Sequence, residues 1–137
     1  MKYMLLVSMS RERWENMATW SPEETKSVVG YMDELMKELT ESGEFVGGEG
    51  LGGPARMRVV QGRPGGEPLV TDGPMAEAKE FLAGYMAIDV ASEDRAIEIA
   101  KRWATCPTPG GDYAPIEVHP IMSEGPNDPE LLEPYRT

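Results

Sequence analysis

A chain of 137 residues, 40% of them hydrophobic and 27% charged, has the composition of one globular domain with a single modest core. Its 24 acidic and 13 basic residues give a formal net charge of −11. This charge argues against nucleic acid and anionic membranes as partners, since both bind basic surfaces, and no apolar run is long enough to span a bilayer.

The cysteine count and the first residues bear on the cellular compartment. Cys106 is the one cysteine in the sequence, so no intramolecular disulfide can form, which fits a reducing compartment. The apolar run at residues 2–7 is too short for the core of a signal peptide and indicates a first strand instead. We therefore expect a cytoplasmic protein.

A helix is predicted after the first strand. The polar stretch 8–20 indicates a loop or short helical turn, and Ser21, Pro22 and Glu24 then have the spacing of a capped helix start. Gly43 is placed to end this helix. Its apolar side chains fall on one stripe, formed by Val28, Met32, Leu35, Met36 and Leu39.

Five further strands and one helix are predicted in the rest of the domain. The expected strands are 44–51 (glycine-rich and irregular or bulged), 57–60, 68–71, 81–90 and 116–122. The second and third of these form a hairpin, and Ser92 caps a helix that precedes the last strand. The domain is therefore expected to cover residues 1–122, followed by a C-terminal tail over 123–137.

With the hairpin set aside, the element order is β-α-β-β-α-β, the ferredoxin-like arrangement. We predict an α+β fold with a four-stranded antiparallel sheet, an inserted β-hairpin and both helices on one face. Alternation along the strands assigns side chains to the two faces. On the helix side we expect Leu82, Met86, Ile88, Val90, Ile116, Val118 and Met122. On the other side we expect Phe81, Ala83, Tyr85, Ala87, Asp89, Glu117, His119 and Ile121.

The face without helices mixes aromatic, small and ionisable side chains. It is too apolar to face open water and too polar for an ordinary core. We therefore expect a homodimer, in which a second copy of the chain covers this face and encloses a pocket for a small-molecule ligand.

Asp72, Gly73 and Pro74 predict a shaped loop before the 81–90 strand. Asp72 at the lip of this loop is a candidate general base. Alternatively, its side chain bonds to its own backbone in an Asx-type turn and holds the bend.

His119 is the one histidine, the residue type that ordinarily titrates near neutral pH. With Glu117 two residues away on the same face, it is a candidate for proton transfer, and otherwise a hydrogen-bonded residue of the interface. Tyr85, Phe81 and Tyr3 are the aromatic candidates for contacting a substrate, although the pattern of the first strand leaves the face of Tyr3 open. Glu117 is a further candidate for substrate binding.

A dyad of Asp72 and His119 is chemically attractive, but the expected sheet places the first strand between the 81–90 and 116–122 strands. The two side chains would then meet only if the Asp72 loop folds over the pocket, or if they pair across the dimer. No metal or other cofactor is expected, because one histidine and one cysteine on distant segments do not make a zinc site. Cys106 is expected to be an ordinary buried or loop thiol.

Four separated motifs resemble the YCII-related (DGPF-domain) family. They are residues 1–6, the Gly-Gly-Glu-Gly-Leu stretch 47–51, the stretch 71–90 around Asp72-Gly73-Pro74, and residues 116–122. Met75 stands where that family usually has Phe, and His119 where members often have Arg. The resemblance implies a dimeric α+β barrel, but it does not imply one activity, since most members have no assigned function.

Two classes of function therefore stay open. The first is a metal-free enzyme that uses Asp72 and His119 for proton transfer on an aromatic or hydroxylated substrate. The resemblance brings in this substrate class, because some relatives act on chlorinated or hydroxylated aromatic compounds. The second is a non-catalytic module that binds a small ligand or a protein. The resemblance links it to sigma-factor pathways, because many relatives are encoded beside extracytoplasmic-function sigma factors.

Overall fold

The computed structural model describes residues 1–75, 77–123, 125 and 128–136. Ala76 of the Asp-Gly-Pro stretch and residues 124, 126–127 and 137 of the expected tail lie outside the described residues.

The main sheet has four antiparallel strands in the order β2-β5-β1-β6. These strands are β1 (Lys2–Ser10), β2 (Phe45–Gly50), β5 (Glu80–Asp89) and β6 (Ile116–Pro120). The predicted α+β class and the central position of the first strand are confirmed. Antiparallel sheets of this kind commonly have one covered face and one open face.

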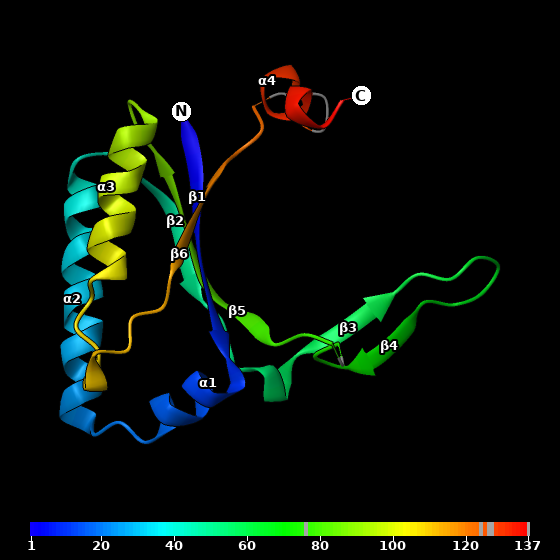
Figure 1. Ribbon diagram of the computed structural model, residues 1–137, viewed down its shortest axis with the longest axis horizontal. Helices are drawn as coiled ribbons and strands as arrows, with labels where there is room; N and C mark the ends of the chain where they lie inside the picture. The colour runs from blue at the N-terminus through cyan, green and yellow to red at the C-terminus, as the bar shows by residue number, and fades with distance from the viewer. Residues whose placement is uncertain (76, 124, 126–127, 137) are drawn as a thin grey trace.

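Helices α2 (Pro22–Glu41) and α3 (Glu93–Ala104) lie side by side on one face of this sheet (Figure 1). The predicted capping box is present at the start of α2: the Glu24 N–H donates to Ser21 Oγ at 3.1 Å, and the Ser21 N–H to Glu24 Oε1 at 2.9 Å. Gly43, just beyond the C-terminal end of α2, has φ +81, a conformation that favours glycine. Local sequence therefore sets both ends of α2.

A further helix, α1 (Arg11–Ala18), occupies most of the stretch expected to be a loop or short helical turn. Ser10 ends β1 and at once caps α1, its Oγ accepting from the Arg13 N–H at 3.3 Å. Strand β1 is thus longer than predicted, and α1 lies across one end of the sheet (Figure 1).

The hydrophobic core lies between the sheet and the pair α2 and α3. Its most completely buried side chains are Leu5, Leu35, Leu39, Ile88 and Ile99. They come from two strands and both helices, which is why the sheet and the helices form one packed unit.

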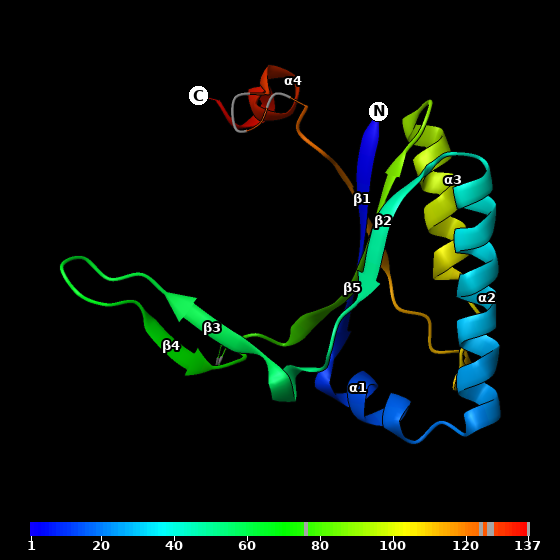
Figure 2. The same cartoon turned by 180° about the vertical axis from the view of Figure 1, so that it is seen from behind.

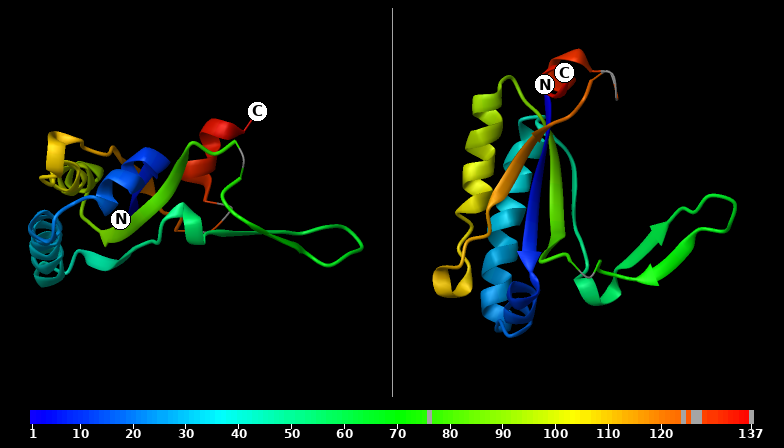
Figure 3. Two further views of the ribbon diagram at one scale, coloured as in Figure 1. Left: turned by 90° about the horizontal axis from the view of Figure 1, so that it is seen from below. Right: turned by 45° about the vertical axis from the view of Figure 1, so that its right-hand side comes forward.

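The predicted hairpin is present as β3 (Arg58–Gln61) and β4 (Leu69–Asp72), preceded by the 3₁₀ turn η1 (Pro54–Arg56). It extends away from the sheet on the side opposite α2 and α3, as Figure 2 shows from behind. The C-terminal segment, with α4 (Pro129–Leu132) and the turn η4 (Glu133–Tyr135), leaves on that same side (Figures 1 and 3). The short 3₁₀ turn η2 (Pro109–Gly111) lies between α3 and β6.

One extra residue in β5 changes the faces predicted for its first part. Val7 pairs with Gly84 but Ser8 pairs with Leu82, so Ala83 forms a bulge. Beyond it, Phe81 is buried on the helix side and Leu82 is exposed on the other side. The predicted faces of these two residues were therefore wrong, because a bulge reverses the alternation.

Within the described part of the chain, no helix combines the length and apolar character needed to cross a membrane.

Candidate functional site

The face of the sheet without helices is called the free face here. The strand register aligns Met4 between Ala87 and His119, and Leu6 between Tyr85 and Glu117. The face therefore has an apolar strip, flanked by Glu49 on one side and by Glu117 and His119 on the other. The strip consists of Met4, Leu6, Leu82, Tyr85 and Ala87. The predicted location of Tyr85, Glu117 and His119 on one face is confirmed.

His119 and Glu117 form a pair on β6, an edge strand. His119 Nε2 lies 2.8 Å from Glu117 Oε1, and both side chains are about half exposed in the single chain. A carboxylate on one ring nitrogen orients the imidazole. The pair therefore presents an oriented imidazole next to the apolar strip.

Asp72 ends β4 in the projecting hairpin and is 87% exposed. Its Oδ1 lies 3.2 Å from Arg58 Nε on the neighbouring strand, and among the described residues it forms no Asx-type bond to the backbone. Asp72 is thus held by a cross-strand ion pair, not by the turn that was the alternative to catalysis.

The single chain does not bring Asp72 to His119. The chain that follows Asp72 enters β5 at Glu80, which pairs with Ser10, whereas His119 pairs with Met4. Six residues of β1 separate these two levels, about 20 Å at the usual rise of a strand. The hairpin also turns away from the sheet (Figure 1). A dyad within one chain is therefore not formed.

Tyr3 and Phe81 lie on the helix side of the sheet and are buried, so neither can contact a ligand on the free face. Burial raises the pKa of the Tyr3 hydroxyl. The Arg11 guanidinium lies 5.8 Å from the centre of the Phe81 ring, a cation–π contact that ties α1 to the start of β5. The predicted face of Phe81 was therefore wrong, and the structure decides the face of Tyr3, which the sequence left open.

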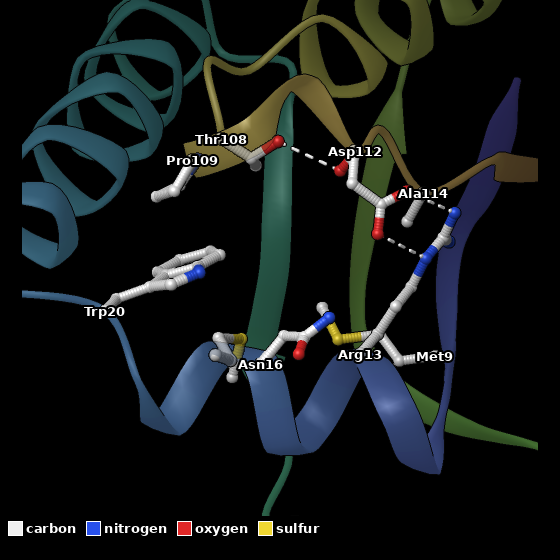
Figure 4. A pocket seen from close by; sticks show the side chains of 9 residues that line it. Met9, Arg13, Asn16, Trp20, Thr108, Pro109, Asp112 and Ala114 are labelled. Carbon is white, nitrogen blue, oxygen red and sulfur yellow. Dashed lines mark hydrogen bonds and ion pairs between the residues drawn. The ribbon is translucent and has the colours of Figure 1, made fainter.

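A small pocket on the helix side lies between α1 and the turn η2 (Figure 4). One wall is the fork of Arg13 on Asp112, with Nε to Oδ2 at 3.0 Å and Nη2 to Oδ1 at 2.9 Å. Trp20 and Pro109 form the opposite side. At about 100 Å³ this pocket holds little more than a few water molecules, so we regard it as part of the α1 anchor.

A larger cavity of about 490 Å³ lies between α1, α2 and the helix side of the sheet. The sequence reasoning missed it, because the α2 stripe was interpreted as uniform core. In the structure Leu35 and Leu39 are buried, whereas Val28, Met32 and Met36 are only half-buried and line this cavity. The available signal was the methionines on the stripe together with the glycines of β2.

Other polar groups serve the fold. Two hydrogen bonds from Arg95 lower the pKa of Glu44 to about 2. Burial raises the pKa of the Cys106 thiol, which favours the unreactive protonated form. Among the described residues no group of three His, Cys, Asp or Glu side chains could hold a metal ion.

Comparison with known proteins finds the YCII-related domain over residues 1–121. The chain is also 31% identical, over 116 residues, to an uncharacterised protein of Rhizobium meliloti (strain 1021). This similarity covers 81% of the chain and 86% of that relative.

Proposed function

The chain belongs to the YCII-related family, and from that premise we propose that it works as a homodimer that binds a small molecule between two free faces. The observation that carries this proposal is the apolar strip on a sheet face that α2 and α3 leave uncovered, with ionisable side chains along both edges. Two such sheets facing each other form a dimeric α+β barrel.

The placement of the two protruding segments supports the dimer. The β3–β4 hairpin and the C-terminal segment both project on the side of the free face (Figure 1). The hairpin exposes Val60, Leu69 and Val70, apolar side chains that a partner subunit would remove from water. In the proposed dimer the hairpin therefore acts as an arm that packs against the second copy.

The chemistry proposed for the pocket is proton transfer on an aromatic or hydroxylated substrate. His119 and Glu117 supply the proton-transfer pair, and Tyr85 supplies an aromatic surface and a hydroxyl beside it. Asp72 takes part only from the arm of the partner subunit, since its own chain holds it away from His119. The lone Cys106 is consistent with the cytoplasmic location that belongs to this proposal.

The alternative is a binding module without catalysis, as in a sigma-factor pathway. The ion pair of Asp72 with Arg58 favours it, because this candidate general base already has a partner in the single chain. The two functions predict different results for a variant without His119: the enzyme loses turnover, whereas the binding module keeps its ligand binding unchanged.

The dimer is tested first, by light scattering on the full chain after size-exclusion chromatography. Leu82→Lys puts a charge on the apolar strip, and Ile97→Lys puts one on α3. The two positions make a matched pair of variants, because Leu82 is 39% exposed and Ile97 is 38% exposed in the single chain. We expect Leu82→Lys to give monomers and Ile97→Lys to leave the dimer intact. A wild-type monomer at micromolar concentration would refute the dimer.

Chemistry is tested with His119→Asn and a panel of phenols and hydroxy acids. Ligand binding is followed by NMR line broadening and turnover by product analysis. An enzyme predicts that the variant still binds a ligand but loses at least a hundredfold in turnover, the usual scale of general acid–base catalysis. Binding without turnover in the wild-type protein, unchanged in the variant, favours the module.

A further inference from the structure

Two protruding segments bound the free face at opposite ends of its strands. The β3–β4 hairpin lies at the end of β1, because the chain that follows it re-enters the sheet at Glu80, which pairs with Ser10. The C-terminal segment leaves at the start of β1, where the Ile121 N–H donates to the Lys2 carbonyl oxygen at 2.9 Å. Both segments extend on the side of the free face (Figures 1 and 3).

The hairpin is a basic part of an acidic chain. Residues 54–72 contain three arginines and two acidic residues, whereas the whole chain carries a net charge of −11. Arg58 is already paired with Asp72 across the strands. Arg56 and Arg63 are exposed, and within the described part of the chain neither forms an ion pair. The hairpin therefore offers two cationic side chains to an anionic surface.

The C-terminal segment has the opposite charge. Residues 128–136 contain three acidic residues and one arginine. Asp128 is buried and caps α4, its Oδ1 accepting from the Glu130 N–H at 3.2 Å. Glu130 and Glu133 are exposed, and their carboxylates form no ion pair with any other described residue. The segment therefore presents an anionic surface at the other end of the free face.

Both segments also expose apolar side chains. Val60 pairs with Val70, so the two lie on one face of the hairpin, and they are 66% and 62% exposed. Tyr135, in the C-terminal segment, is 82% exposed. The hairpin forms a two-stranded sheet of its own, and such a sheet is at best marginally stable in water unless something packs on it. A partner that covers these side chains would stabilise both segments.

The charges distinguish two ways of placing two free faces together around a two-fold axis. An axis parallel to the strands brings equal ends together, so that hairpin meets hairpin and like charges face each other. An axis across the strands places the hairpin of each subunit at the C-terminal segment of the other, and opposite charges then meet at two symmetric contacts. The second arrangement is the complementary one.

We propose that in the homodimer the β3–β4 hairpin of each subunit docks on the C-terminal segment of the other, with Arg56 and Arg63 facing Glu130 and Glu133. This docking rests on the proposed function, because it requires two free faces that face each other. It adds to that function the binding partner of the hairpin and the relative direction of the two sheets.

The same arrangement changes the distance between Asp72 and His119. Within one chain the base of the hairpin and His119 lie six β1 residues apart, about 20 Å along the strands. When the two-fold axis crosses the middle of β1, at Leu6, the Ser10 level of one subunit coincides with the Lys2 level of the other. The base of the partner's hairpin then lies two residues from the level of His119, about 7 Å along the strands. Docking therefore brings Asp72 of the partner subunit to the end of the pocket that holds His119.

Crosslinking tests the contact between hairpin and C-terminal segment. In a Cys106→Ser background, one chain carries Val60→Cys, and a co-expressed chain with a different tag carries Tyr135→Cys. After treatment with a short bismaleimide, we expect a crosslinked dimer only where the two variants are combined, because the docked segments belong to different subunits. A crosslink between two Val60→Cys chains would show that hairpin meets hairpin and would overturn the proposal.

Charge reversal tests the pairing of opposite charges. Arg56→Glu combined with Arg63→Glu should raise the dimer dissociation constant about tenfold at low ionic strength, because each reversal acts at two symmetric contacts. Lys26→Glu combined with Lys101→Glu is the matched control, since it makes the same change of charge at exposed positions of α2 and α3. The control should stay within about twofold of the wild-type protein. Circular dichroism establishes that all variants fold.

A rescue variant adds Glu130→Arg and Glu133→Arg to the hairpin variant, so that opposite charges meet again. Its dissociation constant should return to within about threefold of the wild-type value. Failure of this rescue, or a hairpin variant that dimerises as well as the control, would overturn the docking.

Light scattering distinguishes this failure from failure of the proposed function. A monomeric wild-type protein overturns both. A wild-type dimer that Leu82→Lys dissociates, but that gives no crosslink when the two cysteine variants are combined, overturns only the docking of the hairpin on the C-terminal segment.

Discussion

Replacing Glu44 by glutamine removes the charge that joins the start of β2 to the first turn of α3. Arg95 Nε donates to Glu44 Oε2 at 2.8 Å and Arg95 Nη2 to Oε1 at 2.8 Å, while the Ser42 hydroxyl donates to Oε1 at 2.8 Å. The Glu44 side chain is only 16% exposed. The pair is therefore a bidentate, mostly buried bridge of the kind that contributes measurably to stability.

The pKa shift of Glu44 gives the size of the expected loss in the free energy of unfolding. These bonds lower the pKa from 4.5 to about 2, and each pKa unit corresponds to about 1.4 kcal/mol. The upper limit is thus about 3.5 kcal/mol, and partial exposure of Arg95 reduces it to about 2 kcal/mol. For 137 residues the unfolding entropy is about 0.29 kcal/mol/K, so Glu44→Gln should lower Tm by about 7 °C at pH 7.

The sign of the pH dependence follows from the lowered pKa. Folding favours the ionised carboxylate, so its contribution is complete above pH 4.5 and is lost as the pH falls toward 2. The stability gap between wild-type protein and Glu44→Gln should therefore be less than half as large at pH 3 as at pH 7.

Urea unfolding at pH 7 and pH 3 measures this gap, and Glu98→Gln is the matched control. Glu98 also bonds to Arg95, at 3.1 Å, but it is 66% exposed and should contribute less than about 0.5 kcal/mol. Two results would refute a stabilising bridge between Glu44 and Arg95. One is a stability difference between wild-type protein and Glu44→Gln that is as large at pH 3 as at pH 7. The other is an equal loss of unfolding free energy in Glu44→Gln and Glu98→Gln.

Three further predictions concern packing and the hairpin. Ile99→Ala, in the fully buried core, should cost about 2–5 kcal/mol in urea unfolding, and a loss below 1 kcal/mol would contradict the packing described. Gly48→Ala should lower Tm where Gly47→Ala does not, because a Cβ at Gly48 would lie 2.8 Å from the Tyr85 carbonyl oxygen; equal melting of the two variants would argue against this contact. Asp72→Asn should change the unfolding free energy by less than about 0.5 kcal/mol, since its ion pair with Arg58 is exposed, and a larger loss would mean that Asp72 is buried against a partner.

Local signals sufficed for most of the fold. The capping box at Ser21 and Glu24, the glycine after α2, and the alternation of β6 each depend on neighbours in sequence. They also sufficed to place His119, Glu117 and Tyr85 on one face. The hairpin was predicted from its two apolar runs and turn, but the direction in which it leaves the sheet was not.

The sequence by itself determined the order of the six strands and the positions of α2 and α3, because caps and periodicity act over a few residues. Only the tertiary structure decided where Ala83 interrupts the pairing of β5 with β1, and hence that Phe81 lies inside and Leu82 outside. It alone decided the ion pair of Asp72 with Arg58 and the space between α1, α2 and the sheet. Register, bulges and cavities depend on how separate elements fit against each other, and no single stretch of sequence contains that information.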